Sequence, residues 1–483
     1  MGASHTDLSS GGARCSRRTL LEYGVAGSAL FYAFPLIAPR AVQAVQSGGT
    51  AAVRRHTWLL ASASELRPSP PTAPTRAELD ELLRMQALRS AVTNAAIRRW
   101  SDGAGVLPWT TIALDLVKRS RRNPVRAGRA LALLHAAIND AVTAAFDAKM
   151  AYFRERPAVV EPAILQQGPI TPGLSTFPSE QAAIAGAATT VLIYLFPEEP
   201  AERIAALGAD AANACLQAGA NYRSDIVAGL ALGRAVGERA VSRGKTDGSQ
   251  ADWDGTRAHS GEGYWAATPP RYIPEPLEPM AGTWKTWAVR DVAALRPPPP
   301  PLWGTPAWRA ELDAVRQATA SRTPQQAEAA LFWAGNDGTV TPAGIWLEIA
   351  RDLIKRDRLD TPQAARILGM TTIAMADAFV CCWDAKYTYW SARPIQGDVR
   401  LDVLFPTPPF PSYTSGHATI SGAAAAVLGG VFPNDAQDLD ARAVEAKNSR
   451  LWAGFHYPID NDVGLAHGRQ IGRLVLERET MTL

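Results

Sequence analysis

Alanine-rich segments with a helical spacing of apolar residues are the feature that most constrains the fold of this 483-residue chain. Apolar residues recur there at a spacing of about three to four, the period of an α-helix rather than of a strand. Segments of this kind cover residues 127–147, 181–196, 224–243, 323–334, 344–356 and 361–390. We find no convincing series of alternating strands between them. The sequence therefore predicts an all-α fold, and the chain is long enough to form two hydrophobic cores.

The proline run at residues 297–301 is the best internal boundary, because polyproline is a stiff connector between folded units. We predict a signal segment (1–44), an N-terminal extension (45–109), an N-terminal helical bundle (110–296), a Pro-rich linker (297–302) and a C-terminal bundle (303–483). Within the bundles, Thr323-Pro324 and Thr361-Pro362 are typical of a helix cap followed by a first-turn proline.

The N-terminus carries the pattern of an export signal. Arg17 and Arg18 precede an apolar run at residues 23–38, and Val-Gln-Ala at 42–44 is a plausible cleavage site. This pattern is typical of a twin-arginine signal, and it predicts a periplasmic or extracellular protein that begins near Val45. An uncleaved membrane tether is the alternative, although the apolar run is short for a membrane span.

Charge and hydropathy exclude two classes of partner. The formal net charge is +3, and it falls to +1 without residues 1–44, which carry four arginines and two acids. A nearly neutral protein is a poor candidate for nucleic-acid binding. After the first 40 residues we find no uncharged apolar run of about 18 residues, so no stable membrane span is expected there.

Three short segments near the C-terminus carry the candidate chemistry. They are Lys-Tyr-Thr-Tyr-Trp-Ser-Ala-Arg-Pro at 386–394, Ser-Gly-His at 415–417, and Ser-Arg-Leu-Trp-Ala-Gly-Phe-His-Tyr-Pro-Ile-Asp at 449–460. Lys386, Arg393 and Arg450 supply cations that suit oxygens pointing in different directions. Ser415 and Gly416 supply donors at an expected helix start, where the macrodipole is positive. Together these residues predict a site for a tetrahedral oxyanion.

The two histidines of these segments need a chemical role, because a site that only binds an anion does not need imidazole. His456 precedes Asp460 by four residues, so the carboxylate can reach back and fix the imidazole tautomer. The other ring nitrogen is then free to act as a nucleophile or metal ligand. His417 stands at the expected helix start as a candidate general acid or base.

The spaced motifs resemble the signature shared by vanadium-dependent haloperoxidases, type 2 phosphatidic acid phosphatases and bacterial acid phosphatases. The shared pattern is Lys, six residues, Arg-Pro; then Ser-Gly-His; then Ser-Arg, five residues, His, three residues, Asp, and this chain matches every element. The resemblance implies a pair of four-helix bundles with the anion site in the C-terminal one. It also implies vanadate as cofactor, with phosphate able to occupy the same site.

The resemblance assigns a role to each matching residue. It implies that the anion oxygens are held by Lys386, Arg393, Ser415, Gly416 and Arg450. His456 would bond the vanadium or phosphorus, His417 would act as acid or base at the apical oxygen, and Asp460 would orient His456.

Residues outside the shared motifs favour the haloperoxidase branch. Trp383 and Phe410 resemble aromatic positions around vanadate in fungal chloroperoxidases. Asp337 lies in a stretch similar to one whose aspartate supports an anion-binding arginine, which would be Arg393 here. The short segment between the Ser-Gly-His and Ser-Arg motifs resembles the bacterial branch.

The resemblance therefore predicts a haloperoxidase that uses hydrogen peroxide to oxidise halide to hypohalous acid or an equivalent halogenating species. The alternative is a soluble exported acid phosphatase that works through a phosphohistidine at His456. The choice of halide, an organic substrate and a homo-oligomer remain open at this point.

Overall fold

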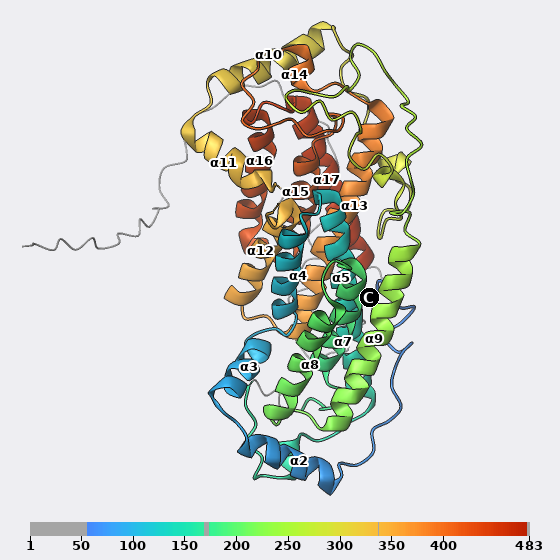
Figure 1. Ribbon diagram of the computed structural model, residues 1–483, viewed down its shortest axis with the longest axis vertical. Coiled ribbons are helices and arrows are strands. Elements are labelled where there is room, and N and C mark those ends of the chain that lie inside the picture. Colours follow the sequence, from blue (N-terminus) through green and yellow to red (C-terminus); the bar gives the residue numbers. More distant parts are fainter. Residues whose placement is uncertain (1–55, 169–172, 337, 481–483) are drawn as a thin grey trace, which may run out of the picture.

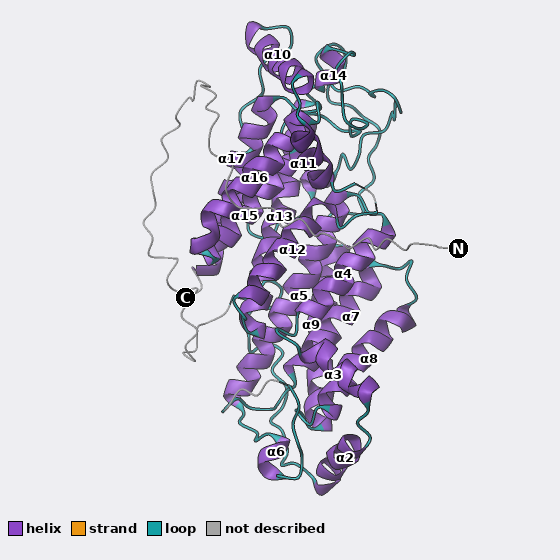
Figure 2. Cartoon of the chain, turned by 90° about the vertical axis from the view of Figure 1, so that its left-hand side faces the viewer, coloured by secondary structure: helices purple, strands orange, loops and turns teal. Residues whose placement is uncertain are grey.

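The computed structural model describes residues 56–168, 173–336 and 338–480, which form α-helices, short 3-10 turns and loops (Figure 2). No strand occurs in these ranges, where the nearest feature is an isolated bridge between Tyr264 and Ser391. The predicted all-α fold is therefore confirmed. The predicted signal segment and Asp337 lie outside the described residues.

The helices of the first half include the long helix α5. They are α2 (Arg76–Ala87), α3 (Ala91–Ser101), α4 (Leu107–Ser120), α5 (Pro124–Ala151), α6 (Pro157–Val160), α7 (Glu180–Leu195), α8 (Ala201–Gln217) and α9 (Arg223–Lys245). The helices of the second half include the long helix α13. They are α10 (Pro306–Ala320), α11 (Pro324–Ala334), α12 (Thr341–Arg356), α13 (Thr361–Tyr389), α14 (Pro394–Gly397), α15 (Gly416–Val431), α16 (Ala436–Trp452) and α17 (Pro458–Thr480). Three 3-10 turns complete the order, at Ala281–Thr283, Ala293–Leu295 and Pro433–Asp435.

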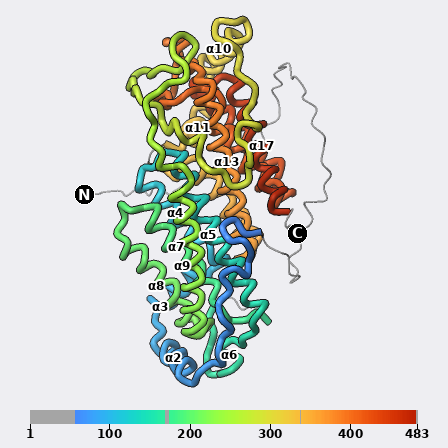
Figure 3. Tube along the Cα trace, turned by 90° about the vertical axis from the view of Figure 1, so that its right-hand side faces the viewer, coloured from blue at the N-terminus to red at the C-terminus, as the bar shows by residue number. Residues whose placement is uncertain are grey.

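The two halves lie one above the other along the long axis of the molecule (Figures 1 and 3). Helices α5, α7, α8 and α9 pack together in the lower half, and α13, α15, α16 and α17 pack together in the upper half. The long helices α5 and α13 pack against each other at the centre. The alanines that line both helices allow this close approach, since most of them are fully buried.

Side-chain caps fix where the important helices begin. Asn123 caps α5, Ser179 caps α7 and Ser415 caps α15, each accepting a backbone N–H of the first turn. Thr323 caps α11, as predicted. The predicted cap of α13 is wrong by one residue: Asp360 caps that helix, because its carboxylate reaches the N–H of Gln363 and Thr361 is already helical.

Helix α13 is the one described helix whose length and composition would allow it to cross a membrane. Its most apolar window is 94% buried inside the protein, so its apolar surface serves core packing. Its last turns carry Trp383 and Lys386 toward the candidate site.

The long connection between α9 and α10 lies mainly over the upper half (Figure 1). The backbone N–H groups of Trp287, Ala288 and Val289 donate to the buried carboxylate of Asp377 in α13, at 2.7, 2.7 and 3.0 Å. These contacts favour a domain boundary soon after α9, earlier than the proline run; the division into domains itself remains a prediction.

Candidate functional site

The pair of His456 and Asp460 is held by the start of α17. The helix begins at Pro458, so Asp460 lies in its first turn and His456 lies just before it. Oδ2 of Asp460 is 2.9 Å from Nδ1 of His456 and accepts the backbone N–H of Tyr457 at 3.2 Å. Because the carboxylate accepts the Nδ1 proton, the neutral imidazole presents a lone pair at Nε2. Burial, followed by the charges of neighbouring cations, lowers the pKa of His456 well below its usual value.

Arg393 is fully buried at the N-terminal cap of α14. Its Nη1 lies 3.0 Å from Nε2 of His456 and donates to the carbonyl of Phe455 at 2.8 Å. Its Nε donates to the carbonyl of Phe410 at 2.8 Å. Nη2 is buried and has no hydrogen-bond partner among the described residues. A guanidinium with an unused buried donor is well suited to receive an anion oxygen.

Lys386 is the second buried cation, near the end of α13. Its Nζ donates to the carbonyls of Pro411 and Ser412 at 2.9 and 2.8 Å. An ammonium has three N–H donors, so one remains for a ligand. Burial lowers the pKa of Lys386 to about 7, which means that the protein gains by bringing a negative charge near it.

Arg450 comes from the last turn of α16. Its Nε donates to Oγ of Ser449 at 2.9 Å, and its Nη2 donates to the carbonyl of Ala330. The side chain is buried, and burial lowers its pKa to about 9. Neutral partners therefore hold this guanidinium, and its charge is left for another group to balance.

The start of α15 brings backbone donors to the same place. Ser415 is the cap, its N–H donates to the backbone carbonyl of Asp460 at 2.9 Å, and Gly416 is the first helical residue. A Cβ added to Gly416 would lie 3.3 Å from Cζ3 of Trp383, so the glycine leaves open a space that other residues would fill. A helix N-terminus with such a space is a favourable place for an anion.

His417 lies half-buried in the first turn of α15, on the more exposed side of the group. Its Nε2 is 3.3 Å from the carbonyl of Ala334, so in the neutral ring that nitrogen carries the proton and Nδ1 holds the lone pair. Burial, and then the charge of Arg450, lowers the pKa of His417 well below its usual value. The imidazole is therefore neutral before an anion binds.

Trp383 and Phe410 form an aromatic wall beside the cations. Their ring centroids are 5.1 Å apart, and Nζ of Lys386 lies 5.0 Å from the Phe410 centroid. Cζ of Arg393 lies 4.8 Å from the same centroid. The rings therefore shield the cations from water while attracting them electrostatically.

The predicted residues of the three motifs thus meet in one place. Lys386, Arg393, His417 and Arg450 all lie close enough to His456 to influence its pKa, so the five side chains are neighbours. Within the described part of the chain, none of the three cations forms an ion pair with a carboxylate; Asp460 bonds His456 instead. Buried charges without a partner are costly, so this group is suited to the binding of an anion.

Ser412 is a residue that the sequence analysis missed. Its Oγ donates to Oδ2 of Asp460, and its carbonyl accepts from Lys386. It therefore links the cation to the carboxylate that orients His456. Its signal in the sequence is its place in Pro411-Ser412, shortly before the Ser-Gly-His motif.

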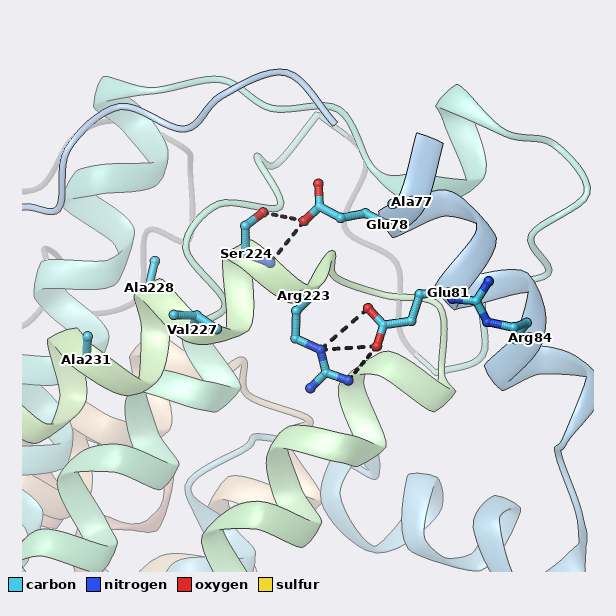
Figure 4. Close-up of a pocket in the computed structure, with 9 residues that line it drawn as sticks. All are labelled: Ala77, Glu78, Glu81, Arg84, Arg223, Ser224, Val227, Ala228 and Ala231. Carbon is cyan, nitrogen blue, oxygen red and sulfur yellow. Dashed lines mark hydrogen bonds and ion pairs between the residues drawn. The ribbon is translucent and has the colours of Figure 1, made fainter. Parts of the chain in front are cut away.

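A separate pocket lies between α2 and α9, far from this site (Figures 1 and 4). Four of its polar side chains are paired with each other: Arg223 bonds Glu81 at 2.6 Å, and Ser224 bonds Glu78 at 2.6 Å. None of the predicted site residues lines it.

Comparison with known proteins agrees with the motif resemblance. A model described as PAP2 superfamily matches residues 129–243, which run from α5 to α9. Vanadium chloroperoxidase of Curvularia inaequalis is 28% identical over 152 residues, covering 23% of this chain and 25% of that protein. The chain thus spans about a quarter of the length of that relative.

Two solved structures share the fold. One is described as the first bacterial vanadium-dependent iodoperoxidase (TM-score 0.61, 22% identity, 85% of this chain and 98% of that chain). The other is an apo-type bacterial vanadium-dependent chloroperoxidase (TM-score 0.54, 15% identity, 74% and 93%). A PAP2 superfamily model thus matches part of the first half, and the chain has the fold of bacterial vanadium haloperoxidases, which confirms the predicted resemblance.

Proposed function

For a chain with a PAP2 superfamily domain and the fold of vanadium haloperoxidases, we propose the activity of a vanadate-dependent haloperoxidase. It would use hydrogen peroxide to oxidise halide to hypohalous acid or an equivalent halogenating species. The observation that carries the proposal is the group of three buried cations, unpaired within the described residues, beside an oriented imidazole.

The residues present fit vanadate, which is a tetrahedral oxyanion. Lys386, Arg393 and Arg450 would neutralise its charge, and the buried Nη2 of Arg393 is a donor that still needs an acceptor. Ser415 and the N–H of Gly416 would donate at the start of α15. When bound, vanadate would supply a Lewis-acidic centre that activates hydrogen peroxide toward halide.

His456 would hold the cofactor through Nε2. Asp460 keeps the proton on Nδ1, so Nε2 offers its lone pair without first losing a proton. The hydroxyl of Ser412 and the N–H of Tyr457 hold Asp460 in turn, and both favour its ionised form against the burial that raises its pKa to about 6.

His417 would manage the proton that the reaction consumes. Peroxide, halide and one proton give hypohalous acid and water, so a base that can be recharged from solvent is needed at the site. His417 is half-buried, and in its neutral ring Nδ1 holds the lone pair that would take up that proton. Trp383 and Phe410 would limit the entry of water.

An acid phosphatase is the alternative from the same motifs, and the comparisons do not favour it. The relative and both solved structures named above are described as peroxidases. The aromatic wall beside Lys386 also favours the haloperoxidase branch by the resemblance stated above.

We also propose export by the twin-arginine-type signal. Mass analysis of the mature protein should find an N-terminus near Val45; an intact Met1 in the mature protein would defeat this part.

The deciding experiment compares two activities of one purified protein. After loading with orthovanadate, peroxide-dependent halogenation of a dye is measured with iodide, bromide and chloride, against a blank of free vanadate. Hydrolysis of p-nitrophenyl phosphate is measured without vanadate. The same assays are run on Arg450→Ala and on Arg442→Ala, which removes a partly exposed guanidinium from the same helix.

Rapid halogenation with feeble hydrolysis is the expected result. Arg450→Ala should lose the halogenation activity. Arg442→Ala should keep it, because the surface ion pair that this variant removes contributes only about 0.5 kcal/mol or less. Rapid hydrolysis with only trace halogenation would instead establish the phosphatase.

A further inference from the structure

The two halves of the chain repeat each other helix by helix. Helices α5 and α13 have 28 and 29 residues, α7 and α15 have 16 each, α8 and α16 have 17 each, and α9 and α17 have 23 each. Within each half the short second helix packs most extensively on the last one, so the packing order is repeated as well. The helices of the first half therefore have counterparts at the candidate site.

Buried carboxylates confirm the correspondence residue by residue. Asp140 of α5 accepts the N–H groups of Trp58, Leu59 and Leu60, between 2.7 and 3.0 Å. Asp377 of α13 accepts three consecutive N–H groups in the same way.

An arginine in the last helix of each half also contacts a tryptophan whose backbone binds the buried aspartate of the other half. Arg243 of α9 lies over the ring of Trp287, and Arg478 of α17 lies over the ring of Trp58, with 3.7 and 5.4 Å from Cζ to the centroid. The repeat thus extends to the tryptophans that precede each long helix.

The first half also carries a second copy of a site motif. Residues 149–157 read Lys, six residues, Arg-Pro, the same pattern as residues 386–394. Lys149 is fully buried, and its Nζ donates to the carbonyls of Ser175 and Thr176 at 2.8 and 3.3 Å. Lys386 donates to the carbonyls of the counterpart residues. Arg156 caps α6 as Arg393 caps α14, and its Nε is buried without a partner among the described residues.

The support around the orienting carboxylate is repeated as well. Oδ2 of Asp225 accepts from Oγ1 of Thr176 at 2.8 Å and from the N–H of Tyr222 at 2.9 Å. The N–H of Ser179 donates to the carbonyl of Asp225 at 3.0 Å. Asp460 has the matching bonds from a hydroxyl, from the backbone of a tyrosine and from the cap of α15.

What differs is the part that would touch a ligand. Cys215 stands at the counterpart of Arg450, Asn221 at that of His456, and Gln181 at that of His417. The most telling change is Glu180, which begins α7 as Gly416 begins α15. Oε2 of Glu180 lies 3.0 Å from Nζ of Lys149.

We propose that the first half contains a second, closed copy of the oxyanion site, in which the carboxylate of Glu180 occupies the place of a bound anion. Glu180 provides the counter-charge that Lys149 needs, and it does so from the helix position that is left open at Gly416. Burial works to raise the pKa of Glu180, but Lys149 outweighs it and the pKa lies below its usual value, so the carboxylate is ionised. The copy holds an anion but has no imidazole for chemistry.

Removal of the Glu180 carboxylate should open the second site to an external anion. Glu180→Gly removes the internal anion and restores the space and the backbone donors that Gly416 provides in the other half. Lys149, the unpartnered Nε of Arg156 and the start of α7 would then bind a free tetrahedral oxyanion such as phosphate. The ligand class is that of the candidate site in the second half.

Phosphate binding to the vanadate-free protein tests this by calorimetric stoichiometry and by the shift of Tm with added phosphate. The unmodified chain should bind one equivalent, Glu180→Gly two, and Glu180→Gly with Lys149→Met one. Glu180→Gln is the matched control, because it removes the charge and keeps the volume: its Tm should fall, and phosphate should raise it only as much as it raises the Tm of the unmodified chain. The Tm of Glu180→Gly should fall in buffer and rise with phosphate by more than the Tm of the unmodified chain does.

A single equivalent in Glu180→Gly, with no added response of Tm to phosphate, would overturn the proposal. If folded Glu180→Gly is recovered only when phosphate is present throughout purification, that dependence on phosphate supports the proposal. If Glu180→Gly cannot be recovered either with or without phosphate, the same measurements on Glu180→Ala decide the question. The number of bound phosphate equivalents also tests the two sites independently. An unmodified chain that binds no phosphate would count against the candidate site, while a gain of one equivalent in Glu180→Gly would still support the closed copy.

Discussion

Nη1 of Arg393 lies 3.0 Å from Nε2 of His456, the nitrogen to which we assign the cofactor. Because Asp460 bonds the opposite ring nitrogen, the guanidinium donates to the imidazole lone pair. An entering oxyanion must therefore replace this one contact with two, one to the lone pair of His456 and one to the N–H donor of Arg393. The tautomer is set before the anion arrives, and the arginine is already within reach of the anion oxygens.

His456→Ala should abolish vanadate binding while the fold stays intact. The substitution removes the one side chain that would bond the cofactor directly, but it leaves the helices and the three cations in place. Retained vanadium is measured by elemental analysis after gel filtration, turnover by dye halogenation, and the fold by circular dichroism. Full vanadate-dependent turnover in this variant would refute the assigned mechanism.

Asp460→Asn should weaken vanadate binding by about 10- to 100-fold with a small change in Tm, because losing an outer partner of a ligand histidine has an effect of this size. The amide can donate where the carboxylate accepts, so the Nδ1 proton is no longer fixed. Titration of activity with vanadate gives the apparent Kd. Ser412→Ala, which removes one support of Asp460, should show a smaller effect in the same direction; equal affinity in all three proteins would contradict the role of Asp460.

Anion affinity should fall as pH rises above about 7. Burial lowers the pKa of Lys386 to about 7 in the free site, whereas a bound anion favours the ammonium and raises that pKa. Binding above pH 7 therefore takes up a proton, and affinity should drop by about tenfold per pH unit. The sign for stability is opposite: an unfolded lysine keeps its proton to a pKa of about 10.4, so the anion-free protein gains stability as pH rises through this window.

Sulfate is the probe for this test, since it is tetrahedral and does not itself titrate near neutral pH. Calorimetry from pH 7 to 9 should give the slope for the unmodified chain, and Lys386→Met should bind weakly with little slope. A flat profile in the unmodified chain would show that Lys386 does not change protonation on binding.

Gly416→Glu should close the candidate site in the way that Glu180 closes its counterpart. The new carboxylate would pair with Lys386, so vanadate uptake should be lost while Tm is maintained. The Cβ contact of 3.3 Å with Trp383 requires only a small shift of the ring. Gly416→Gln should also lose vanadate, but with a lower Tm because it brings no charge; vanadate affinity equal to that of the unmodified chain in Gly416→Glu would contradict the prediction.

The periodicity of the sequence predicted helices α5, α7, α9, α11, α12 and α13, and the motifs with their family resemblance predicted which side chains meet. Helix α13 illustrates the first point: residues 361–390 were predicted and Thr361–Tyr389 is helical. Its cap was misplaced by one residue because Asp360 and Thr361 both suit that position, and only the backbone geometry distinguishes them.

Two features needed the three-dimensional structure. Ser412 has no distinctive spacing, and its importance comes from bonds to residues distant in sequence. The closed copy could be detected from the second Lys-x6-Arg-Pro pattern at 149–157, but its histidines are absent. A search for catalytic residues therefore passes over it, and only the contact of Glu180 with Lys149 shows what replaced the anion.

The exchanged contacts of the two halves determine how this protein can be divided in the laboratory. A recombinant fragment that starts at the proline run would lack Trp287–Val289, and it would leave the carboxylate of Asp377 buried without its three donors. It would also lose Trp58, over which Arg478 of the last helix lies. Neither half is therefore expected to behave as an autonomous folding unit, and the region that holds the three anion-site motifs should be produced together with the first half.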